Sequence, residues 1–346
     1  MFLDFIPTAE YNTLITEQNI TQMNGDFFMS IKHDFPFDPT CGYTREQLLA
    51  VKGTAPTDEF IAFWRKTYDL TMNAELDYQP EGEVWSPDEN VKIYRVRFRN
   101  WDDVEIVTWI ARPAHSTGGL LIGQGYGNMA TPPTGTDPGL TIVLPNIRGL
   151  GFSQHKDIPW EPGKHAGYGI ESKETYVIRG CVSDLWMAAR VMIDMFPDTA
   201  DALYYQGGSL GGGMGALAVA FDPRIKAAYL NVPTLGGKIQ FEFPASEGDP
   251  AYTRQYHALN VPGGMELFSY FDASAAAHLI KIPTLVTPAL FDPSVPPPAQ
   301  FAVANSIPEE YRIMRIRDVG HFAATDRDKE LEKELEKIRE KLFSPA

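Results

Sequence analysis

LYYQGGSLGGGMGALAVA occupies residues 203–220 of the chain. Its first four residues are mostly apolar, as in a buried strand, and its last nine are mostly small and apolar, as in a closely packed helix. Between them, Gly207–Gly211 fits the pattern G-x-S-x-G, in which a strand turns sharply into a helix and small neighbours are needed because the turn is tight. The stretch therefore predicts that Ser209 stands at a helix N-terminus, above the edge of a sheet, as a nucleophile.

Two other interpretations of this stretch remain open. The glycines could form a packing turn in which the serine is incidental. A nucleotide-binding loop is disfavoured, because the stretch lacks the G-K-[ST] ending of a P-loop and no acidic residue follows at the distance expected in a dinucleotide-binding unit. The strand before Ser209 and the helix after it favour the nucleophile.

The rest of the chain alternates strands and helices around this stretch. Short apolar or alternating runs predict strands, and a 3.6-residue apolar period predicts a long helix at 176–195. The predicted strands are 91–98, 103–110, 119–123, 140–144, 203–206, 225–230, 284–290 and 311–316. An antiparallel pair followed by buried strands indicates an α/β fold with a mostly parallel central sheet flanked by helices, and an α/β-hydrolase sheet in particular.

The same patterns suggest how the chain is organised. Residues 1–80 are predicted to form an N-terminal extension with a helix that begins near Thr57 and packs on the core, and residues 81–346 the catalytic domain. Residues 232–282 contain several prolines and glycines, and we expect them to form an insertion that lines the site. A charged helix with one narrow apolar stripe is predicted at 326–343. The stripe would dock on the sheet or, alternatively, meet a second subunit.

A serine nucleophile needs a base, and the hydrolase fold places the base after the last strand and the acid one strand earlier. Of the seven histidines, only His321 follows the last predicted strand. Asp292 follows the preceding strand and is the predicted acid. Asp318, three residues before His321, is a competing candidate for the acid.

Composition disfavours several classes of protein and of partner. The chain has 346 residues, of which 44% are hydrophobic and 22% charged, as in an ordinary globular protein. A net charge of −15 disfavours nucleic acid and anionic membranes as partners.

The sequence also shows no metal site. Cys41 and Cys181 form no metal-binding pair, and Asp318-x-x-His321 is only half a metal site, so we expect no metal and no cofactor. The N-terminus shows no secretory leader, and we expect a cytoplasmic protein.

Several blocks occur together in a conspicuous order and spacing. They are F-I-A-F-W at 60–64, V-T-W-I-A-R-P at 107–113, N-I-R-G-L-G at 146–151, Y-V-I-R-G at 176–180, G-G-S-L-G-G-G at 207–213, the long block 271–297 and G-H at 320–321. Over about residues 55–325 the chain resembles the acetyl xylan esterase and cephalosporin C deacetylase family, carbohydrate esterase family seven. Residues 1–50 do not take part in the resemblance.

The resemblance implies a catalytic triad of Ser209, Asp292 and His321. It implies an oxyanion hole made by the backbone N–H groups of Tyr126 and Leu210, and no cofactor. It further implies that small acylated substrates such as acetylated xylo-oligosaccharides lose their acetyl groups, and that the protein is a ring-like homo-oligomer, often a hexamer.

Four positions depart from the family pattern. Leu150 and Leu210 stand where the family has glutamines, Gln124 where it has a histidine, and Phe322 where it has a glutamate. These changes leave the predicted triad and the main-chain donors in place. They indicate a less polar pocket, unless the side chains point away from substrate and change only the packing. Trp160, in a polar loop, is a further candidate pocket residue.

The sequence therefore predicts a serine esterase that removes short acyl groups, above all acetyl. Two alternatives stay open: a serine hydrolase of another ester or a peptide, and a non-enzymatic scaffold on the same fold. Preference for acyl chain length distinguishes the first alternative. The converging triad argues against the second.

Overall fold

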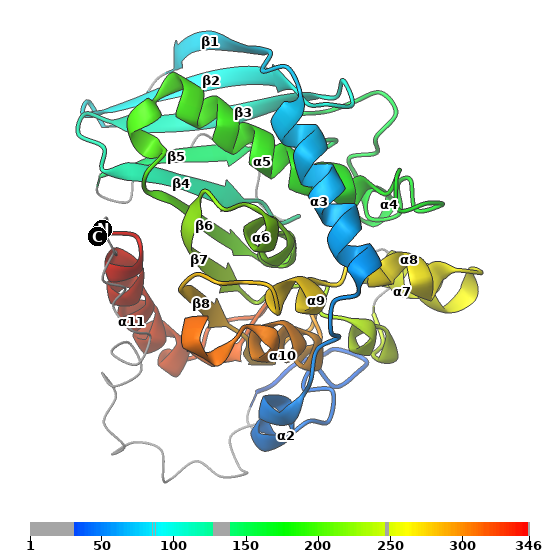
Figure 1. The fold of residues 1–346 in the computed structure, drawn as a ribbon. Helices are drawn as coiled ribbons and strands as arrows, with labels where there is room; N and C mark the ends of the chain where they lie inside the picture. Colours follow the sequence, from blue (N-terminus) through cyan, green and yellow to red (C-terminus); the bar gives the residue numbers. More distant parts are fainter. Residues whose placement is uncertain (1–30, 85, 87, 127–138, 246–248, 345–346) are drawn as a thin grey trace.

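The computed structural model describes residues 31–84, 86, 88–126, 139–245 and 249–344 (Figure 1). Its central sheet has nine strands in the order β1-β2-β3-β5-β4-β6-β7-β8-β10. The strands are β1 (Tyr78–Val84), β2 (Val91–Arg99), β3 (Glu105–Pro113), β4 (Gly118–Gly123), β5 (Leu140–Pro145), β6 (Leu203–Gly208), β7 (Ile225–Asn231), β8 (Thr284–Thr287) and β10 (Arg312–Met314). The pairings from β1 to β5 along the sheet are antiparallel and all others are parallel, which confirms the predicted α/β-hydrolase architecture.

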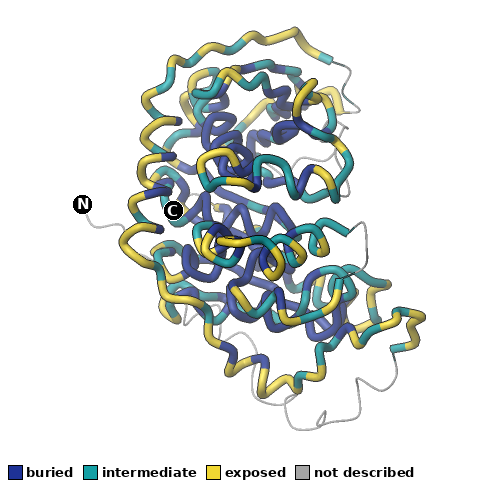
Figure 2. The backbone as a smooth tube through the Cα atoms, turned by 90° about the vertical axis from the view of Figure 1, so that its right-hand side faces the viewer, coloured by how far each residue is buried: buried dark blue, intermediate teal, exposed yellow. Residues whose placement is uncertain are grey.

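Helices cover both faces of this sheet. They are α2 (Arg45–Ala50), α3 (Asp58–Asn73), α4 (Pro162–His165), α5 (Val177–Met195), α6 (Leu210–Phe221), α7 (Pro250–Asn260), α8 (Gly264–Ser269), α9 (Ala273–Ala277), α10 (Pro297–Ser306) and α11 (Asp326–Leu342), with short 3-10 turns at Pro197–Thr199, Lys238–Glu242 and Glu309–Tyr311. One hydrophobic cluster joins α3, α5, α6 and α9 to the sheet, and a second joins α11 to the opposite face. Buried positions accordingly concentrate between the layers (Figure 2). None of the described helices is long and apolar enough to cross a bilayer.

The C-terminal helix α11 forms where the sequence predicted it. Thr325 and Asp328 cap its N-terminus reciprocally through side chain and backbone. The stripe residues Leu335, Ile338 and Leu342 are buried against the sheet. The apolar stripe therefore docks within this chain, as the first of the two interpretations predicted.

Two predicted strands are shorter than expected. The run 284–290 divides into β8 and β9 (Ala289–Phe291), because Pro288 between them has no N–H for a sheet ladder. Of the run 311–316 only β10 forms a strand, and β11 (Arg317–Val319) follows it and pairs with β9 in a separate parallel sheet. The strand that leads to His321 is thus β11 and not the predicted run ending at 316.

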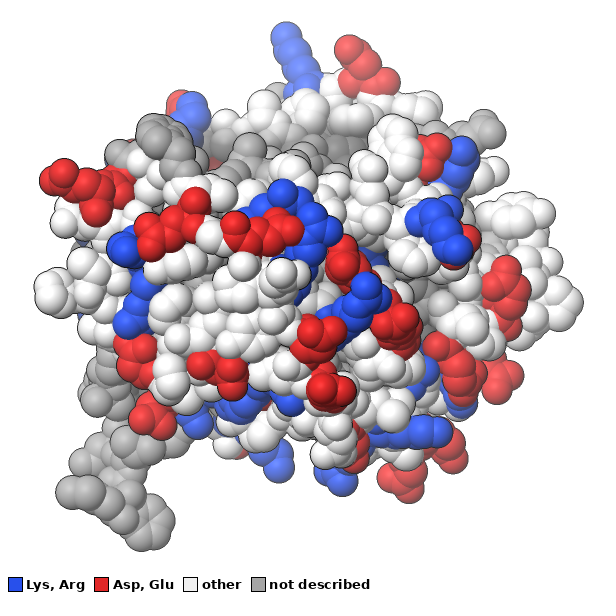
Figure 3. All heavy atoms as spheres, turned by 90° about the horizontal axis from the view of Figure 1, so that it is seen from above, with Lys and Arg blue, Asp and Glu red and all other residues white. Residues whose placement is uncertain are grey.

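The first strand, β1, was not predicted, because its residues are mostly exposed and include a proline and a glycine. It forms an edge of the sheet and pairs with β2. Ion pairs cross this edge, among them Lys92 Nζ with Glu83 Oε1 at 2.8 Å and Arg95 Nε with Glu81 Oε2 at 3.0 Å. Seen from above, acidic and basic side chains lie intermixed (Figure 3). Charges on an edge strand oppose pairing with further strands.

Candidate active site

Ser209 lies between β6 and α6, in the turn that the sequence predicted. Its backbone has φ 56° and ψ −121°, a strained conformation for a residue with a side chain and one that clusters at functional sites. A Cβ on Gly207 would stand 2.5 Å from the Gly211 carbonyl oxygen, and a Cβ on Gly211 would stand 2.2 Å from the carbonyl oxygen of Gly123. The strained serine is therefore held by neighbours that only glycine can supply.

Asp292 and His321 meet because β9 and β11 are parallel neighbours. The register pairs Val319 with Phe291, so the two loops leave the same edge side by side. His321 Nδ1 lies 2.8 Å from Asp292 Oδ2 and 3.1 Å from Oδ1. The structure thus joins the predicted base directly to the predicted acid.

The surroundings of His321 favour its protonated form. Burial opposes the charged imidazolium, but the hydrogen bond and charge of Asp292, helped by Asp249, outweigh burial and raise the pKa of His321 above its ordinary value. Asp249 is the N-cap of α7 in the predicted insertion. The insertion therefore comes within electrostatic reach of the imidazole.

Three further donors fix the carboxylate of Asp292. Its Oδ1 accepts the N–H groups of Ser294 and Val295 at 2.8 and 2.9 Å. Its Oδ2 accepts the side-chain amide of Gln300 at 2.8 Å, and the carbonyl of that amide accepts the N–H of Ala289. Gln300 is fully buried. Sequence reasoning missed Gln300, because a glutamine near the start of α10 carries no pattern that separates it from a surface residue.

Asp318 is bound elsewhere. Its carboxylate pairs with Arg327 Nη1 at 2.6 Å and accepts the hydroxyl of Thr325 at 3.0 Å. Burial raises its pKa, although Arg327 and Thr325 act in the opposite direction. The hydrogen bonds of Asp318 therefore stabilise the start of α11. The carboxylate that contacts the imidazole of His321 is that of Asp292.

Ser209 reaches the same edge of the sheet through β7 and β8. Its N–H donates to the carbonyl of Asn231 at 3.0 Å, and the hydroxyl of Thr287 donates to Asn231 Oδ1 at 2.6 Å. Among the described residues no hydrogen bond joins Ser209 to His321. Such bonds are often long before substrate binds. All three predicted residues nevertheless lie beyond the carboxyl ends of parallel strands, where α/β sheets bind ligands.

The two predicted oxyanion donors flank the serine. Leu210 is the first residue of α6, where the helix offers its N–H no internal acceptor. A Cβ on Gly125 would stand 3.6 Å from the Cβ of Ser209, so the loop that contains Tyr126 lies against the serine. The hydroxyl of Tyr126 forms a hydrogen bond with Nδ1 of His165 at 3.0 Å, which holds the Tyr126 side chain in place.

The four departures from the family pattern divide into packing residues and one partly exposed ring. Leu150 and Leu210 are buried in the large hydrophobic cluster, and Gln124 is buried with its carbonyl oxygen bonded to the N–H of Ile147 at 3.0 Å. Phe322 is only half-buried and packs on Phe291. The packing interpretation therefore suits the first three, and Phe322 is the departure that changes an accessible surface. Trp160 is 63% exposed, as the sequence led us to expect.

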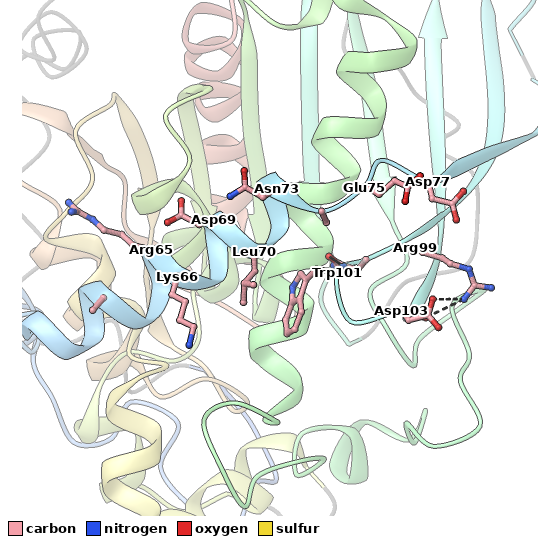
Figure 4. A pocket seen from close by; sticks show the side chains of 13 residues that line it. Arg65, Lys66, Asp69, Leu70, Asn73, Glu75, Asp77, Arg99, Trp101 and Asp103 are labelled. Carbon is pink, nitrogen blue, oxygen red and sulfur yellow. Dashed lines mark hydrogen bonds and ion pairs between the residues drawn. The ribbon is translucent and has the colours of Figure 1, made fainter.

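A hollow of the described surface lies apart from these residues. It measures about 800 Å³ and lies beside α3 and the turn after β2 (Figure 4). Both signs of charge line it, including the Arg99–Asp103 ion pair. None of its lining residues belongs to the predicted site. The Asp292–His321 pair and the strained turn at Ser209 mark the candidate active site. No cluster of three or more metal-ligating side chains occurs in the described part of the chain.

Gly320 offers a direct test of the acid's position. A Cβ on Gly320 would stand 1.9 Å from Asp292 Oδ2, so Gly320→Ala must displace the carboxylate from His321. We expect kcat for an aryl acetate to fall by about 10²-fold, because a displacement of about 1 Å at such a pair costs that much. Circular dichroism of the variant should match the wild type. A folded variant with unchanged kcat would contradict this role for the Asp292–His321 contact.

Comparisons with known proteins identify the family of this chain. The sequence model of the acetyl xylan esterase (AXE1) family matches residues 44–333. The acetyl esterase Axe7A of Xylanibacter ruminicola is 25% identical over 174 residues, which are 48% of this chain and 38% of that protein, so the match spans well under half of the relative's length.

Two solved structures share the fold over most of this chain. Acetyl xylan esterase 1 from Thermoanaerobacterium sp. JW/SL YS485 matches with a TM-score of 0.69 and 18% identity, over 87% of this chain and 99% of that one. The acetyl xylan esterase from Paenibacillus sp. R4 matches with a TM-score of 0.67 and 22% identity, over 86% and 99%. Because the family match covers most of the sequence, the chain belongs to the acetyl xylan esterase (AXE1) family.

Proposed function

We propose that this chain is a serine esterase that removes short acyl groups, acetyl above all, from small esters. The observation that carries the proposal is the Asp292–His321 hydrogen bond at the sheet edge where the strained Ser209 lies. Membership of the acetyl xylan esterase family supports the same chemistry.

In the proposed mechanism, Ser209 Oγ attacks the ester carbonyl while His321 Nε2 accepts the hydroxyl proton. Asp292 accepts the hydrogen bond of the Nδ1–H group and stabilises the imidazolium by its negative charge. The oxyanion of the tetrahedral intermediate is held by the N–H groups of Leu210 and Tyr126, and each such donor contributes about 10²–10³-fold in rate. When the carbon–oxygen bond to the alcohol breaks, the alcohol leaves with the proton from His321.

The same groups then hydrolyse the acyl-enzyme, with water in place of the Ser209 hydroxyl as the nucleophile. His321 takes a proton from water, the hydroxide attacks the acyl carbon, and the Ser209 oxygen recovers its proton as the carboxylic acid departs. None of these steps draws on groups beyond the side chains and main-chain N–H groups already named.

Acyl chain length tests the proposed substrate class. We expect kcat/KM to fall from 4-nitrophenyl acetate to the butyrate and the octanoate by at least about tenfold per step, because a site for acetyl has no room for a longer chain and overpacking is costly. The leaving group is the same in all three esters, so the series isolates the acyl side.

A wild-type preference for octanoate would contradict the short-acyl proposal and favour an esterase of longer acyl chains. Turnover of peptide substrates at comparable kcat/KM would favour the peptide-hydrolase alternative. If no ester is turned over, the alternative of a non-enzymatic scaffold on the same fold would be favoured.

For the natural substrate we propose acetylated xylo-oligosaccharides or similar small acetate esters, as the family resemblance implies. We extend the proposal to a homo-oligomer, which the same resemblance implies and which light scattering of the purified chain would test.

A further inference from the structure

Residues 31–43, here called the N-terminal segment, lie against the loop that carries Asp292. The carbonyl oxygen of Pro39, which is buried, accepts the N–H of Asp292 at 3.0 Å. The family match begins at Thr44, so the segment lies outside the part of the chain that defines the family. The predicted acid is therefore contacted directly by residues that the family match does not include.

Local hydrogen bonds order the end of the segment, at residues 38–42. Asp38 Oδ1 accepts the N–H of Thr40 at 2.9 Å, and Asp38 Oδ2 accepts the N–H of Gly42 at 3.1 Å. The helix that follows, α2, buries Leu48 completely, and Asn305 donates to the Leu48 carbonyl at 3.0 Å. The segment is thus a docked part of the fold on the acid side of the site.

The segment sets two rings against the phenylalanines that directly flank the predicted acid and base in the chain. Phe35 packs edge-on against Phe322 with ring centroids 5.8 Å apart, and His33 packs against Phe291 at 5.4 Å. The rings of Phe291 and Phe322 lie 5.4 Å apart, and those of His33 and Phe35 5.6 Å apart. We call these four rings the aromatic wall.

Part of the aromatic wall stays accessible. Phe291 is buried, whereas Phe35 and Phe322 are half-buried and His33 is exposed. A half-exposed aromatic surface releases water when an apolar ring covers it, which favours contact with such a ring. The wall therefore has surface left to bind a ligand.

The position of Phe322 relates this surface to the reaction. In a serine esterase the alcohol takes its proton from the catalytic histidine as it leaves. In the chain Phe322 directly follows His321 and Phe291 directly precedes Asp292, so the aromatic wall adjoins the pair that would supply this proton. An accessible apolar surface beside this pair is available to the alcohol part of the ester.

We infer that the aromatic wall binds the alcohol part of the ester and prefers one that presents a flat, apolar ring face. The inference rests on the proposed function, because it assigns the alcohol side of the same site. Two kinds of alcohol present such a face: an aromatic alcohol, and a sugar whose C–H groups cover one side of its ring. Ethanol offers the wall far less area.

Phe35→Ala removes the ring that the segment contributes next to Phe322. We compare kcat/KM for benzyl acetate, a monoacetylated xyloside and ethyl acetate. The kcat/KM of the ring ester divided by that of ethyl acetate should fall about tenfold, mainly because KM for the ring ester rises. An aromatic contact contributes about this factor to binding. A fall for benzyl acetate alone assigns aromatic alcohols, and a fall for the xyloside alone assigns sugars.

Three further variants complete the test. Phe35→Leu keeps apolar bulk and should recover part of the ratio. Phe322→Leu removes the partner ring and should lower the ratio as Phe35→Ala does, which keeps the test open if Phe35→Ala does not fold. Leu49→Ala changes an exposed apolar side chain of α2 outside the wall and should leave the ratio unchanged.

Ratios that stay at the wild-type value in Phe35→Ala and Phe322→Leu would overturn the inference. The proposed function would still stand in that case, provided that Ser209→Ala abolishes turnover of all three esters. Turnover that does not depend on Ser209 would instead overturn the proposed function.

Discussion

Ser209→Ala should lower kcat/KM for 4-nitrophenyl acetate by at least about 10⁴-fold, because the variant lacks the oxygen that would form the acyl-enzyme. The small residues of the turn and the main-chain donors remain, so KM should change little. The measurement is the initial rate of nitrophenol release from wild type and variant at equal enzyme concentration. The strained φ of 56° at residue 209 should persist, because the surrounding glycines impose it.

A matched serine far from the turn provides the control. Ser269 is exposed at the end of α8, and its hydroxyl bonds the carbonyl of Glu266. Ser269→Ala should therefore retain wild-type rates. Should Ser209→Ala keep activity within tenfold of the wild type, the serine has no part in catalysis and the proposed mechanism fails.

Asp292→Asn should lower kcat by about 10⁴-fold, the size of effect known for such a change in a serine triad. The amide that replaces the carboxylate can donate to Nδ1 of His321, which leaves the proton on Nε2, where the base must be free. The charge that stabilises the imidazolium is also lost. Steady-state kinetics on 4-nitrophenyl acetate measure the effect, and thermal unfolding checks that the buried site still folds.

The pH profile provides a second measurement on the same variant. Only neutral His321 accepts a proton, so kcat/KM rises with pH through its pKa. In the wild type Asp292 raises that pKa. As the pH is lowered, activity should therefore be lost at a pH above the ordinary pKa of histidine. In Asp292→Asn the midpoint of the residual activity should move to lower pH. The raised pKa also stabilises the fold below the unfolded-state pKa, and this contribution is lost as pH rises through the folded-state pKa.

Asp318→Asn separates the two candidate acids. Asp318 bonds Arg327 and Thr325 at the start of α11, so its replacement should affect stability while kcat of the folded protein stays within tenfold. If the large loss of kcat occurs in Asp318→Asn and not in Asp292→Asn, the assignment of the acid is wrong.

The strand, turn and helix around Ser209 were predictable because their signals are local. A tight strand-to-helix turn requires glycines within a few residues of the serine, and the apolar runs on either side reveal strand and helix. The order of serine, acid and base follows from the fold, so Asp292 and His321 could be placed at the ends of the last strands. The structure joins this pair at 2.8 Å.

The boundaries of the last strands were not predictable in the same way. The predicted strands 284–290 and 311–316 extend past the ends of β8 and β10, and β9 and β11 form a pair of their own outside the main sheet. A run of apolar residues reports burial and does not report which neighbour a strand pairs with. The parallel pairing of β9 with β11, which brings the acid to the base, is a property of the sheet as a whole.

By itself the sequence determined the hydrolase architecture, the strained serine turn and the identity of the predicted triad, since each rests on residues adjacent in the chain or on a fixed chain order. Only the tertiary structure decided which groups surround that triad. The side-chain amide of Gln300 donates to the carboxylate of Asp292, and the carbonyl of Pro39 accepts the N–H of Asp292. The ring of Phe35 packs against that of Phe322. Pro39 and Phe35 lie more than 250 residues from their partners in the chain. Contacts at such separation form when the packed core brings distant segments together, and no local pattern records them.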